Sequence, residues 1–354
     1  MKALILSGGK GTRLRPITHT GAKQLVPVAN KPILFYGVEA IRDAGITDVG
    51  IIVGDTENEI RAALGDGSAF GVKTTYIRQE APLGLAHAVK IAQDFMKSDS
   101  FVMYLGDNLI LDGITPLVRE FERDRPNSQI LLAHVPNPQE FGVAELEGTK
   151  VKRLTEKPKE PRSDLALVGV YMFDSSIFDA VNAIKPSPRN ELEITDAIQR
   201  LIDTGKDVHC HIISGWWKDT GKLEDMLEAN RMVLSRAKRR LSGKMDGKSR
   251  TEGEVIVGAG TVVENSILRG PLIIGQNCVI KNSYIGPFTS IYDGVTIQNS
   301  EIEHSIVLER CTIEDIPVRI EASLIGKEVR IQRSQAKPTA YRFMVGDSSL
   351  VDVL

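Results

Sequence analysis

Hydrophobic residues in the first two thirds of the chain alternate between short continuous runs and stretches with helical spacing. The continuous runs predict buried strands, and the helical spacing predicts amphipathic helices that pack against them. Because the two kinds of segment alternate, we expect an α/β fold whose mostly parallel sheet is covered on both faces. The predicted strands are 2–6, 48–53, 73–77 and 101–105, and the predicted helices are 32–44, 57–64 and 85–96.

The middle of the chain has a less regular pattern. Several of its strands should pair antiparallel, as in a small subdomain, and a long helix is expected at 223–241. The basic run at 236–240 fits the solvated end of that helix better than a partner-binding patch. The expected strands here are 129–135, 143–146, 151–155, 166–173 and 208–213.

The last third repeats a short strand pattern. The motif recurs every 17 residues at Val262, Val279 and Thr296, and continues at Thr312 and Val329 with spacings of 16 and 17. Short strands and turns at this period predict a parallel β-helix of hexapeptide type, and the fixed spacing disfavours a β-sandwich. We therefore expect a first domain at 1–241, a linker at 242–253, a β-helix at 254–335 and a tail at 336–354.

The composition excludes several classes of protein. The 354 residues carry a net charge of −2, so no global basic field favours nucleic acid. The three cysteines are far apart and predict neither a disulfide framework nor a zinc site. No apolar run reaches the length of a membrane span, and no signal-peptide pattern precedes the first strand. We expect a cytoplasmic protein that contacts neither membrane nor nucleic acid.

A glycine-rich, basic turn follows the first predicted strand. Residues 8–13 read Gly-Gly-Lys-Gly-Thr-Arg. Glycines let backbone N–H groups approach an anion, and Lys10 and Arg13 add positive charge. The spacing matches neither the Walker A loop nor the dinucleotide-binding fingerprint. The turn therefore predicts a polyphosphate-binding loop of another kind.

Later motifs occur in an order that resembles the sugar nucleotidylyltransferase family over almost the whole chain. Against the pattern usual in one part of the family, His87 replaces Gln and Leu83 replaces Asp. The motifs are the glycine loop through Pro32, Gln-Glu-Ala-Pro-Leu-Gly at 79–84, Gly-Asp-Asn at 106–108, Phe-Gly-Val at 141–143, Glu-Lys-Pro at 156–158, Gly-Val-Tyr at 169–171 and Trp-Trp-Lys-Asp-Thr-Gly at 216–221.

The resemblance implies a fold and a reaction. The fold would be a Rossmann-like, mostly parallel mixed sheet followed by a left-handed parallel β-helix. The resemblance also implies that the chain forms a homo-oligomer. The reaction would join dTTP and glucose 1-phosphate into dTDP-glucose, with pyrophosphate as the second product. The attacking phosphate oxygen is already ionised, so catalysis should depend on positioning and charge neutralisation rather than on a general base.

The resemblance also assigns roles to individual residues, and their chemistry suits those roles. Arg13 can clamp the leaving phosphates, and Lys23 can neutralise the α-phosphate. Asp107 and Asp219 match the preference of Mg²⁺ for one or two carboxylates. The catalytic candidates are Arg13, Lys23, Asp107 and Lys157, and the metal candidates are Asp107 and Asp219.

Two further groups would bind the substrates. Gln79 can pair with the edge of a pyrimidine, and Glu156 can accept from sugar hydroxyls. The nucleotide candidates are Gly8, Gly9, Gly11, Thr12, Arg13, Gln79, Gly84, Leu85 and Asp107. The sugar-phosphate candidates are Asn108, Gly142, Glu156, Lys157 and Val168, with Trp217 as a wall beneath the site.

Three alternatives stay open at the level of sequence. The same chemistry could serve UTP or another sugar 1-phosphate. The β-helix could add an acyltransferase activity, although fold alone does not imply one. The chain could also be an inactive regulatory relative, against which the presence of Arg13, Lys23, Asp107 and Asp219 argues.

Overall fold

The computed structural model describes residues 1–9, 11–334, 336–337 and 340–353. Lys10, expected to add charge to the glycine loop, lies outside the described residues. The chain divides into two compact units. The first unit comprises Met1–Lys10, Gly21–Leu25 and Ile33–Asp219, and the second comprises Gly11–Thr20, Val26–Pro32 and Thr220–Leu354. The chain therefore passes between the units several times before residue 33.

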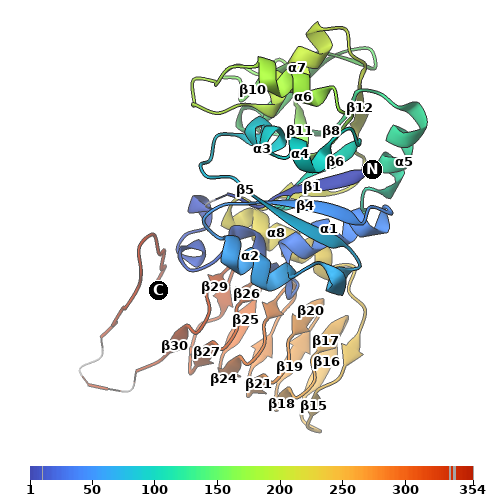
Figure 1. The fold of residues 1–354 in the computed structure, drawn as a ribbon. Helices are drawn as coiled ribbons and strands as arrows, with labels where there is room; N and C mark the ends of the chain where they lie inside the picture. The colour runs from blue at the N-terminus through green and yellow to red at the C-terminus, as the bar shows by residue number, and fades with distance from the viewer. Residues whose placement is uncertain (10, 335, 338–339, 354) are drawn as a thin grey trace. The chain divides into compact units, whose positions relative to one another are not determined.

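The first unit is built on one mixed sheet with the order β10-β9-β11-β6-β1-β4-β5 (Figure 1). Strand β1 pairs in parallel with β4 and β6, whereas β11 pairs antiparallel with β6, β8 and β9. This confirms the expected parallel half and antiparallel middle, except that β12 joins β8 in parallel. The strands are β1 Lys2–Leu6, β4 Asp48–Val53, β5 Lys73–Arg78, β6 Phe101–Leu105, β8 Ser128–His134, β9 Gly142–Glu147, β10 Lys150–Glu156, β11 Leu165–Phe173 and β12 Val208–Ile212.

Helices cover both faces of this sheet. Leu4 and Leu6 pack in one core with α3, α6 and α7, whereas Ala3 and Ile5 pack in a second core with α1, α2 and α5. Alternate residues of a strand point to opposite faces, so a strand buried on both sides reads as a continuous apolar run. The helices are α1 Ile33–Asp43, α2 Glu57–Leu64, α3 Leu85–Ile91, α4 Gln93–Met96, α5 Thr115–Asp124, α6 Ile177–Ala183 and α7 Ile194–Asp203.

Several predicted helix boundaries are wrong. The segment predicted as one helix at 85–96 is interrupted at Ala92, where α3 ends and α4 begins. Helix α8 (Leu223–Leu234) ends earlier than the predicted residue 241. Its expected last turn instead leads to β14 (Arg240–Leu241), because Arg240 and Leu241 pair with Ile256 and Val257 of a neighbouring strand. A long-range strand pairing thus overrides the local helix signal.

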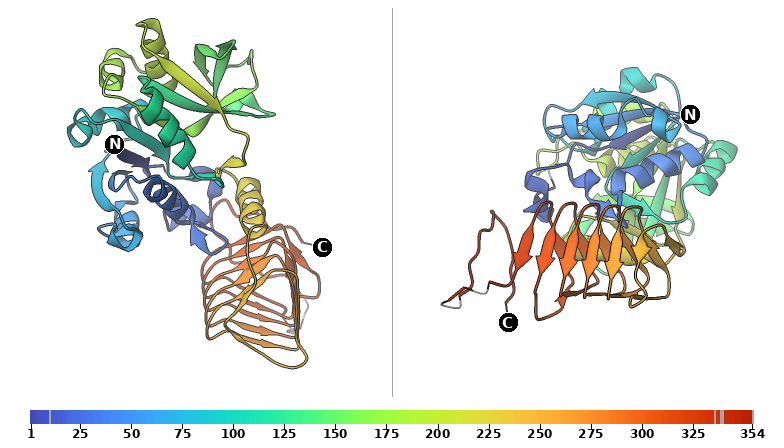
Figure 2. Two further views of the ribbon diagram at one scale, coloured as in Figure 1. Left: turned by 90° about the vertical axis from the view of Figure 1, so that its right-hand side faces the viewer. Right: turned by 90° about the horizontal axis from the view of Figure 1, so that it is seen from below.

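The second unit contains a three-sided parallel β-helix, consistent with the left-handed form (Figure 2). Each side is one parallel sheet. The first is β14, β17 Val255–Val257, β20 Leu272–Ile274, β23 Ser290–Ile291, β26 Ile306–Val307 and β29 Leu324–Ile325. The second is β15 Lys244–Met245, β18 Val262–Glu264, β21 Val279–Lys281, β24 Thr296–Gln298, β27 Thr312–Glu314 and β30 Arg330–Gln332. The third is β16 Arg250–Glu252, β19 Ile267–Arg269, β22 Tyr284–Ile285, β25 Glu301–Glu303 and β28 Ile320–Glu321.

The register of the coils follows the sequence repeat with one exception. Val262 pairs with Val279, and Val279 with Thr296, as the spacing predicts. Thr312, however, pairs with Arg330 and not with the predicted Val329, so the last coil is one residue longer. The stretch 242–253, expected as a linker, contains β15 and β16, which pair with β18 and β19 as part of the first coil.

A ladder of amides occupies one corner of the β-helix. Asn265, Asn282, Asn299 and Asp315 all have positive φ angles, between 46° and 58°. Each amide donates to the next side chain, at 2.8, 3.2 and 2.6 Å. Asparagine tolerates the left-handed conformation that this corner requires, and its side chain can hydrogen-bond along the stack. Asn-Ser recurs at 265–266, 282–283 and 299–300, and these pairs mark this corner in the sequence.

Candidate active site

Lys23, Asp107 and Asp219 come together in the first unit. Lys23 begins the short 3₁₀ segment Lys23–Leu25, and Asp107 lies in the turn between β6 and β7 (Asn108–Ile110). Asp219 ends β13 (Trp217–Asp219), which pairs antiparallel with β7 so that Asp219 stands opposite Asn108. This pairing makes neighbours of two aspartates that are far apart in sequence.

The ammonium of Lys23 lies between the two carboxylates. Its Nζ is 2.5 Å from Oδ2 of Asp107 and 3.7 Å from Oδ1 of Asp219. The side chain of Lys23 is only 7% exposed. Burial by itself raises the pKa of Asp107, but the Lys23 ammonium and a hydrogen bond from Asn108 outweigh it, so the pKa of Asp107 is lowered. Asp107 therefore stays ionised at neutral pH.

Asn108 holds this cluster in place. Its Nδ2 donates to Asp107 Oδ1 at 3.0 Å. Its Oδ1 accepts from the indole N–H of Trp217 at 2.6 Å and from the backbone N–H of Gly169 at 3.2 Å. Asn108 was predicted at the sugar phosphate and Trp217 as a wall, yet the side chain of Asn108 is buried and its amide is engaged with the protein. The structure gives Asn108 a positioning contact with Asp107.

Gly8 and Gln79 lie beside each other in the first unit, whereas a Cβ on Gly9 would lie 3.6 Å from Nε2 of Gln24. A Cβ placed on Gly8 would lie 3.6 Å from Gln79 Oε1. The Nε2 of Gln79 donates to the Gly84 carbonyl at 3.2 Å and to Nδ1 of His87 at 3.0 Å. Burial and then the charge of Lys90 lower the pKa of His87, which suits a neutral imidazole that accepts. The amide N–H groups of Gln79 are therefore occupied, and its oxygen points toward Gly8.

Gly84 has a backbone that other residues would adopt only with strain. Its φ angle is +100°, and a Cβ there would collide with the carbonyl oxygen of Leu192. Leu85 follows as the first residue of α3. The glycine thus lets α3 begin directly beside Gln79, where the nucleotide base was predicted.

The remainder of the glycine loop belongs to the second unit. Gly11 has a φ angle of 62° and precedes the 3₁₀ segment Thr12–Leu14. Thr18 fixes it by donating to the Gly11 carbonyl at 2.6 Å. The guanidinium of Arg13 lies against Gly221, where a Cβ would be 2.9 Å from Nη2. Glycine at 221 therefore leaves the space that Arg13 occupies.

Two of the candidates for the sugar, Gly142 and Glu156, lie at one end of the β9–β10 hairpin. Gly142 and Glu156 stand opposite each other in the two strands. Glu156 accepts from Thr195 Oγ1 and from Arg189 Nη2, both at 3.2 Å. Burial and then Glu193 raise the pKa of Glu156, against the lowering effect of Arg189 and Lys157. Lys157 is exposed, and the side chain of Val168 is buried in the core, which leaves only its backbone for a ligand.

Sequence reasoning missed the residues that surround Glu156. Arg189 also binds Glu193, whose side chain is buried, at 2.8 Å. Ser187 donates to the same carboxylate at 2.6 Å. In the sequence this stretch reads as a polar loop before a helix, and nothing in its composition separates it from a solvated one. Its position beside Glu156 is a result of the tertiary fold.

The aspartate pair fits a divalent cation that takes its other ligands from phosphates and water. In the described part of the chain no three side chains of His, Cys, Asp or Glu converge as a complete metal site. Asp107 and Asp219 supply two carboxylates, the number that Mg²⁺ commonly takes from a protein at phosphate-transfer sites.

In the part of the chain that the structure describes, no helix has the length and apolarity needed to cross a membrane.

Comparisons with known proteins agree with this arrangement. The family model for nucleotidyl transferases matches residues 2–236. Glucose-1-phosphate thymidylyltransferases from Streptomyces griseus and Streptomyces antibioticus are 55% and 57% identical, over 100% of this chain and 99% of each relative. A solved structure from Bacillus anthracis, assigned as a glucose-1-phosphate thymidylyltransferase in complex with a sucrose, superposes with a TM-score of 0.63 at 39% identity. It covers 69% of this chain and 98% of its own.

The chain belongs to the nucleotidyl transferase family, and it is an enzyme of the nucleotidyltransferase kind. Its family uses a divalent metal, which the aspartate pair can hold. The particular reaction follows from the relatives and from the site.

Proposed function

We propose that this enzyme is a glucose-1-phosphate thymidylyltransferase that converts dTTP and glucose 1-phosphate into dTDP-glucose and pyrophosphate. The observation that carries the proposal is the buried ammonium of Lys23 between the carboxylates of Asp107 and Asp219. Such a cluster binds phosphates and a cation together, as nucleotidyl transfer requires. The full-length relatives supply the substrate pair, since both bear the name of this activity.

The chemistry needs positioning more than proton transfer. A phosphate oxygen of glucose 1-phosphate forms a bond to the α-phosphorus, and the bond from the α-phosphorus to the bridging oxygen breaks. The electron pair leaves with the pyrophosphate. Lys23 neutralises charge on the α-phosphate, and Arg13 holds the departing phosphates. Mg²⁺, held by Asp107 and Asp219, would lower the repulsion between the two polyanions when bound.

Substrate recognition is divided between the two groups of residues in the first unit. Gln79 Oε1, directed toward Gly8, can accept from the N–H of a pyrimidine ring. Glu156 can accept from sugar hydroxyls, and Lys157 can bind the sugar phosphate. Because thymine and uracil share the ring N–H, Gln79 alone does not separate dTTP from UTP.

A matrix of nucleoside triphosphates against sugar 1-phosphates tests the proposal. Pyrophosphate release by the purified full-length protein, with Mg²⁺ present, is the measurement. We expect the highest kcat/KM for dTTP with glucose 1-phosphate. A far higher value for UTP, or for another sugar 1-phosphate, would assign the enzyme to a different substrate pair. Acetyl transfer from acetyl-CoA to an amino-sugar phosphate, measured beside it, would show a second activity.

A further inference from the structure

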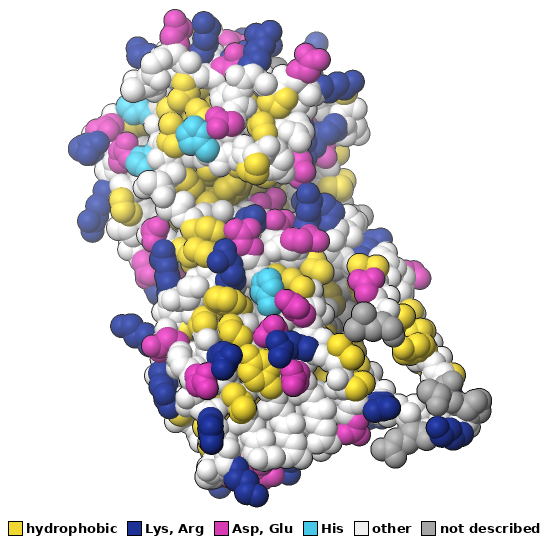
Figure 3. Space-filling view, turned by 180° about the vertical axis from the view of Figure 1, so that it is seen from behind, with side chains coloured by type: hydrophobic (Ala, Val, Ile, Leu, Met, Phe, Trp, Pro, Cys, Tyr) yellow, Lys and Arg dark blue, Asp and Glu magenta, His cyan; other side chains and the backbone are white. Residues whose placement is uncertain are grey.

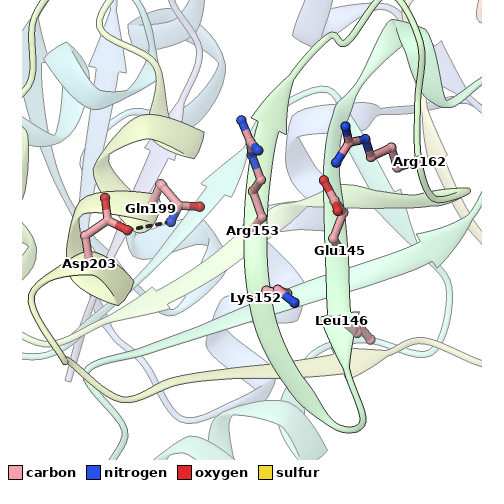
Figure 4. A pocket seen from close by; sticks show the side chains of 7 residues that line it. All are labelled: Glu145, Leu146, Lys152, Arg153, Arg162, Gln199 and Asp203. Carbon is pink, nitrogen blue, oxygen red and sulfur yellow. Dashed lines mark hydrogen bonds between the residues drawn. The ribbon is translucent and has the colours of Figure 1, made fainter.

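A hollow of about 620 Å³ lies on the first unit beside the hairpin β9–β10 and helix α7 (Figure 4). It contains none of the residues predicted to bind the nucleotide or the sugar. Its volume is in the range of small-molecule sites in proteins. The charged and amide side chains that line it are Glu145, Lys152, Arg153, Arg162, Gln199 and Asp203.

A bulge in β10 brings two cationic residues to this hollow. In the ladder Val151 pairs with Leu146 and Arg153 with Glu145, which leaves Lys152 as the extra residue. Strict alternation would turn one of two consecutive side chains inward, yet Lys152 and Arg153 are both exposed. A bulge costs ladder hydrogen bonds and re-aims side chains, and bulges occur often beside functional sites. Here the bulge leaves two consecutive positive side chains exposed at the hollow.

Among the described residues, two guanidinium groups of the hollow have no carboxylate partner. Within the described part of the chain, neither Arg153 nor Arg162 forms an ion pair, although Arg153 stands opposite Glu145. Figure 4 shows both guanidinium groups on the same side of the hairpin as the Glu145 carboxylate. A guanidinium presents donors in a fork that matches phosphate oxygens.

The same hollow offers acceptors. The carboxylates of Glu145 and Asp203 line the hollow together with three cationic side chains, so positive charge exceeds negative charge by one. Gln199 Nε2 donates to Asp203 Oδ1 at 2.8 Å and holds that carboxylate in place. Carboxylates accept hydrogen bonds from hydroxyl groups, whereas guanidinium groups favour phosphate. We propose that this hollow is a second ligand site that binds a phosphorylated sugar.

The hollow shares two elements with the sugar end of the active site. Gln199 on α7 accepts from the backbone N–H of Leu154 on β10 at 2.8 Å. One turn earlier on α7, Thr195 donates to Glu156 at the end of β10. A ligand that bridges β10 and α7 therefore acts on the position of Glu156. This consequence rests on the proposed function, because it is read as a change in KM for glucose 1-phosphate.

Binding of glucose 6-phosphate to the full-length protein tests the site without turnover. Isothermal titration calorimetry would compare the wild type with the double variant Arg153→Gln and Arg162→Gln, and with Lys157→Ala at the sugar end. Arg200→Gln, an exposed arginine on α7 that does not line the hollow, is the matched control. Thermal unfolding of each variant checks the fold.

We expect the double variant to bind about tenfold more weakly or worse, since each charge-assisted hydrogen bond contributes roughly one order of magnitude. Lys157→Ala and Arg200→Gln should bind as the wild type does. Loss of binding in Lys157→Ala alone would place the probe at the sugar end and overturn the proposal, as would no binding to the wild type at all.

The linkage to Glu156 has its own readout. Glucose 6-phosphate should change the KM for glucose 1-phosphate in the wild type and much less in the double variant. An equal effect in both proteins would mean simple competition at the sugar end, and the linkage would be wrong even if the site binds. Absence of any turnover would count against the proposed function and leave the calorimetric result intact.

Discussion

Lys23 is buried and paired, unlike a lysine at the surface. Its side chain is almost fully buried, and its ammonium contacts two carboxylates. A buried charge is costly unless it is paired, and here the two carboxylates supply the charge that compensates the ammonium. In the sequence, Lys23 is one lysine among many, and its place in the family motif, beside the segment with Pro27 and Pro32, distinguished it.

Replacing Lys23 by Ala should lower kcat by about 10²–10³-fold, because a preorganised positive group beside the reacting phosphate would be lost. Pyrophosphate release with dTTP and glucose 1-phosphate measures the effect. Lys2→Ala is the control, since Lys2 forms a partly buried ion pair with Asp99 at 3.0 Å outside the cluster. If Lys2→Ala impaired kcat as strongly, general destabilisation would explain both results.

The double variant Asp107→Asn and Asp219→Asn should lose almost all Mg²⁺-dependent activity. The amides keep the shape of the carboxylates but carry no charge, and Mg²⁺ prefers carboxylate ligands. Activity against Mg²⁺ concentration is the measurement, with circular dichroism to verify the fold. Unchanged activity at low Mg²⁺ would remove these aspartates from the metal site.

The raised pKa of Glu156 predicts the direction in which the KM for glucose 1-phosphate changes with pH. Burial and Glu193 raise its pKa, so this carboxyl takes up a proton at a higher pH than an ordinary glutamate. A protonated carboxyl accepts hydrogen bonds poorly, so the KM for glucose 1-phosphate should rise as the pH falls through the raised pKa. The KM for dTTP should change less over the same pH range. In Glu156→Gln the sugar KM should be high at every pH, and a wild-type pH profile in that variant would refute the assignment.

At the scale of elements, strand pairings determine which functional residues become neighbours. The pairing of β7 with β13 brings Asp219 beside Asp107, and the pairing of β9 with β10 places Gly142 opposite Glu156. In the second unit, α8 supplies Asn230, a fully buried residue that joins three segments. It accepts from Ala29 N–H at 2.8 Å and from Ser290 Oγ at 2.6 Å, and it donates to the Phe288 carbonyl at 2.8 Å. The amide of Asn230 thus links α8 to the turn at Ala29 and to the β-helix.

Asn230→Ala should lower the free energy of unfolding by about 2–4 kcal/mol. The substitution leaves buried donors and an acceptor without partners, and each such group costs roughly 1–3 kcal/mol. Chemical denaturation of the full-length protein is the measurement. Asn58→Ala, at an exposed position of α2, should change stability by less than about 0.5 kcal/mol. Equal effects at the two positions would contradict this role for Asn230.

At the scale of the whole molecule, the second unit combines the β-helix with segments from the start of the chain. The second unit includes Val26–Pro32, a hairpin of β2 (Pro27–Val28) and β3 (Lys31–Pro32), whose turn residues Ala29 and Asn30 have φ angles of 48° and 59°. Asn30 Nδ2 donates to the Ile291 carbonyl of β23 at 2.6 Å. A turn with two non-glycine residues at positive φ needs such support.

On the face shown in Figure 3, acidic and basic side chains are interspersed.

Truncation after Leu241 should therefore impair the protein. It removes Phe288, Ser290 and Ile291, the partners of Asn230 and of the 26–32 hairpin, which directly follows Lys23–Leu25 in the chain. We expect a lower midpoint of thermal unfolding and a lower kcat than in the full-length enzyme. A truncated chain with unchanged melting and turnover would show that the hairpin needs no β-helix.

The sequence by itself determined the local pattern and the chemistry available. Apolar runs located the buried strands, and the 17-residue repeat located the β-helix, because side-chain burial imposes these periods on any such chain. The glycine turn and the motifs named Arg13, Lys23, Asp107, Asp219, Gln79 and Glu156 as candidates. Such signals are local, so they can be recognised without the tertiary structure.

The tertiary structure alone decided which of these residues meet. Long-range pairing placed Asp219 at Asp107, committed the amide of Asn108 to Trp217 and Gly169, and surrounded Glu156 with Arg189 and Thr195. It also ended α8 at Leu234 in favour of β14, and lengthened one coil of the β-helix. Contacts between distant segments depend on register and packing, which no local window of sequence contains.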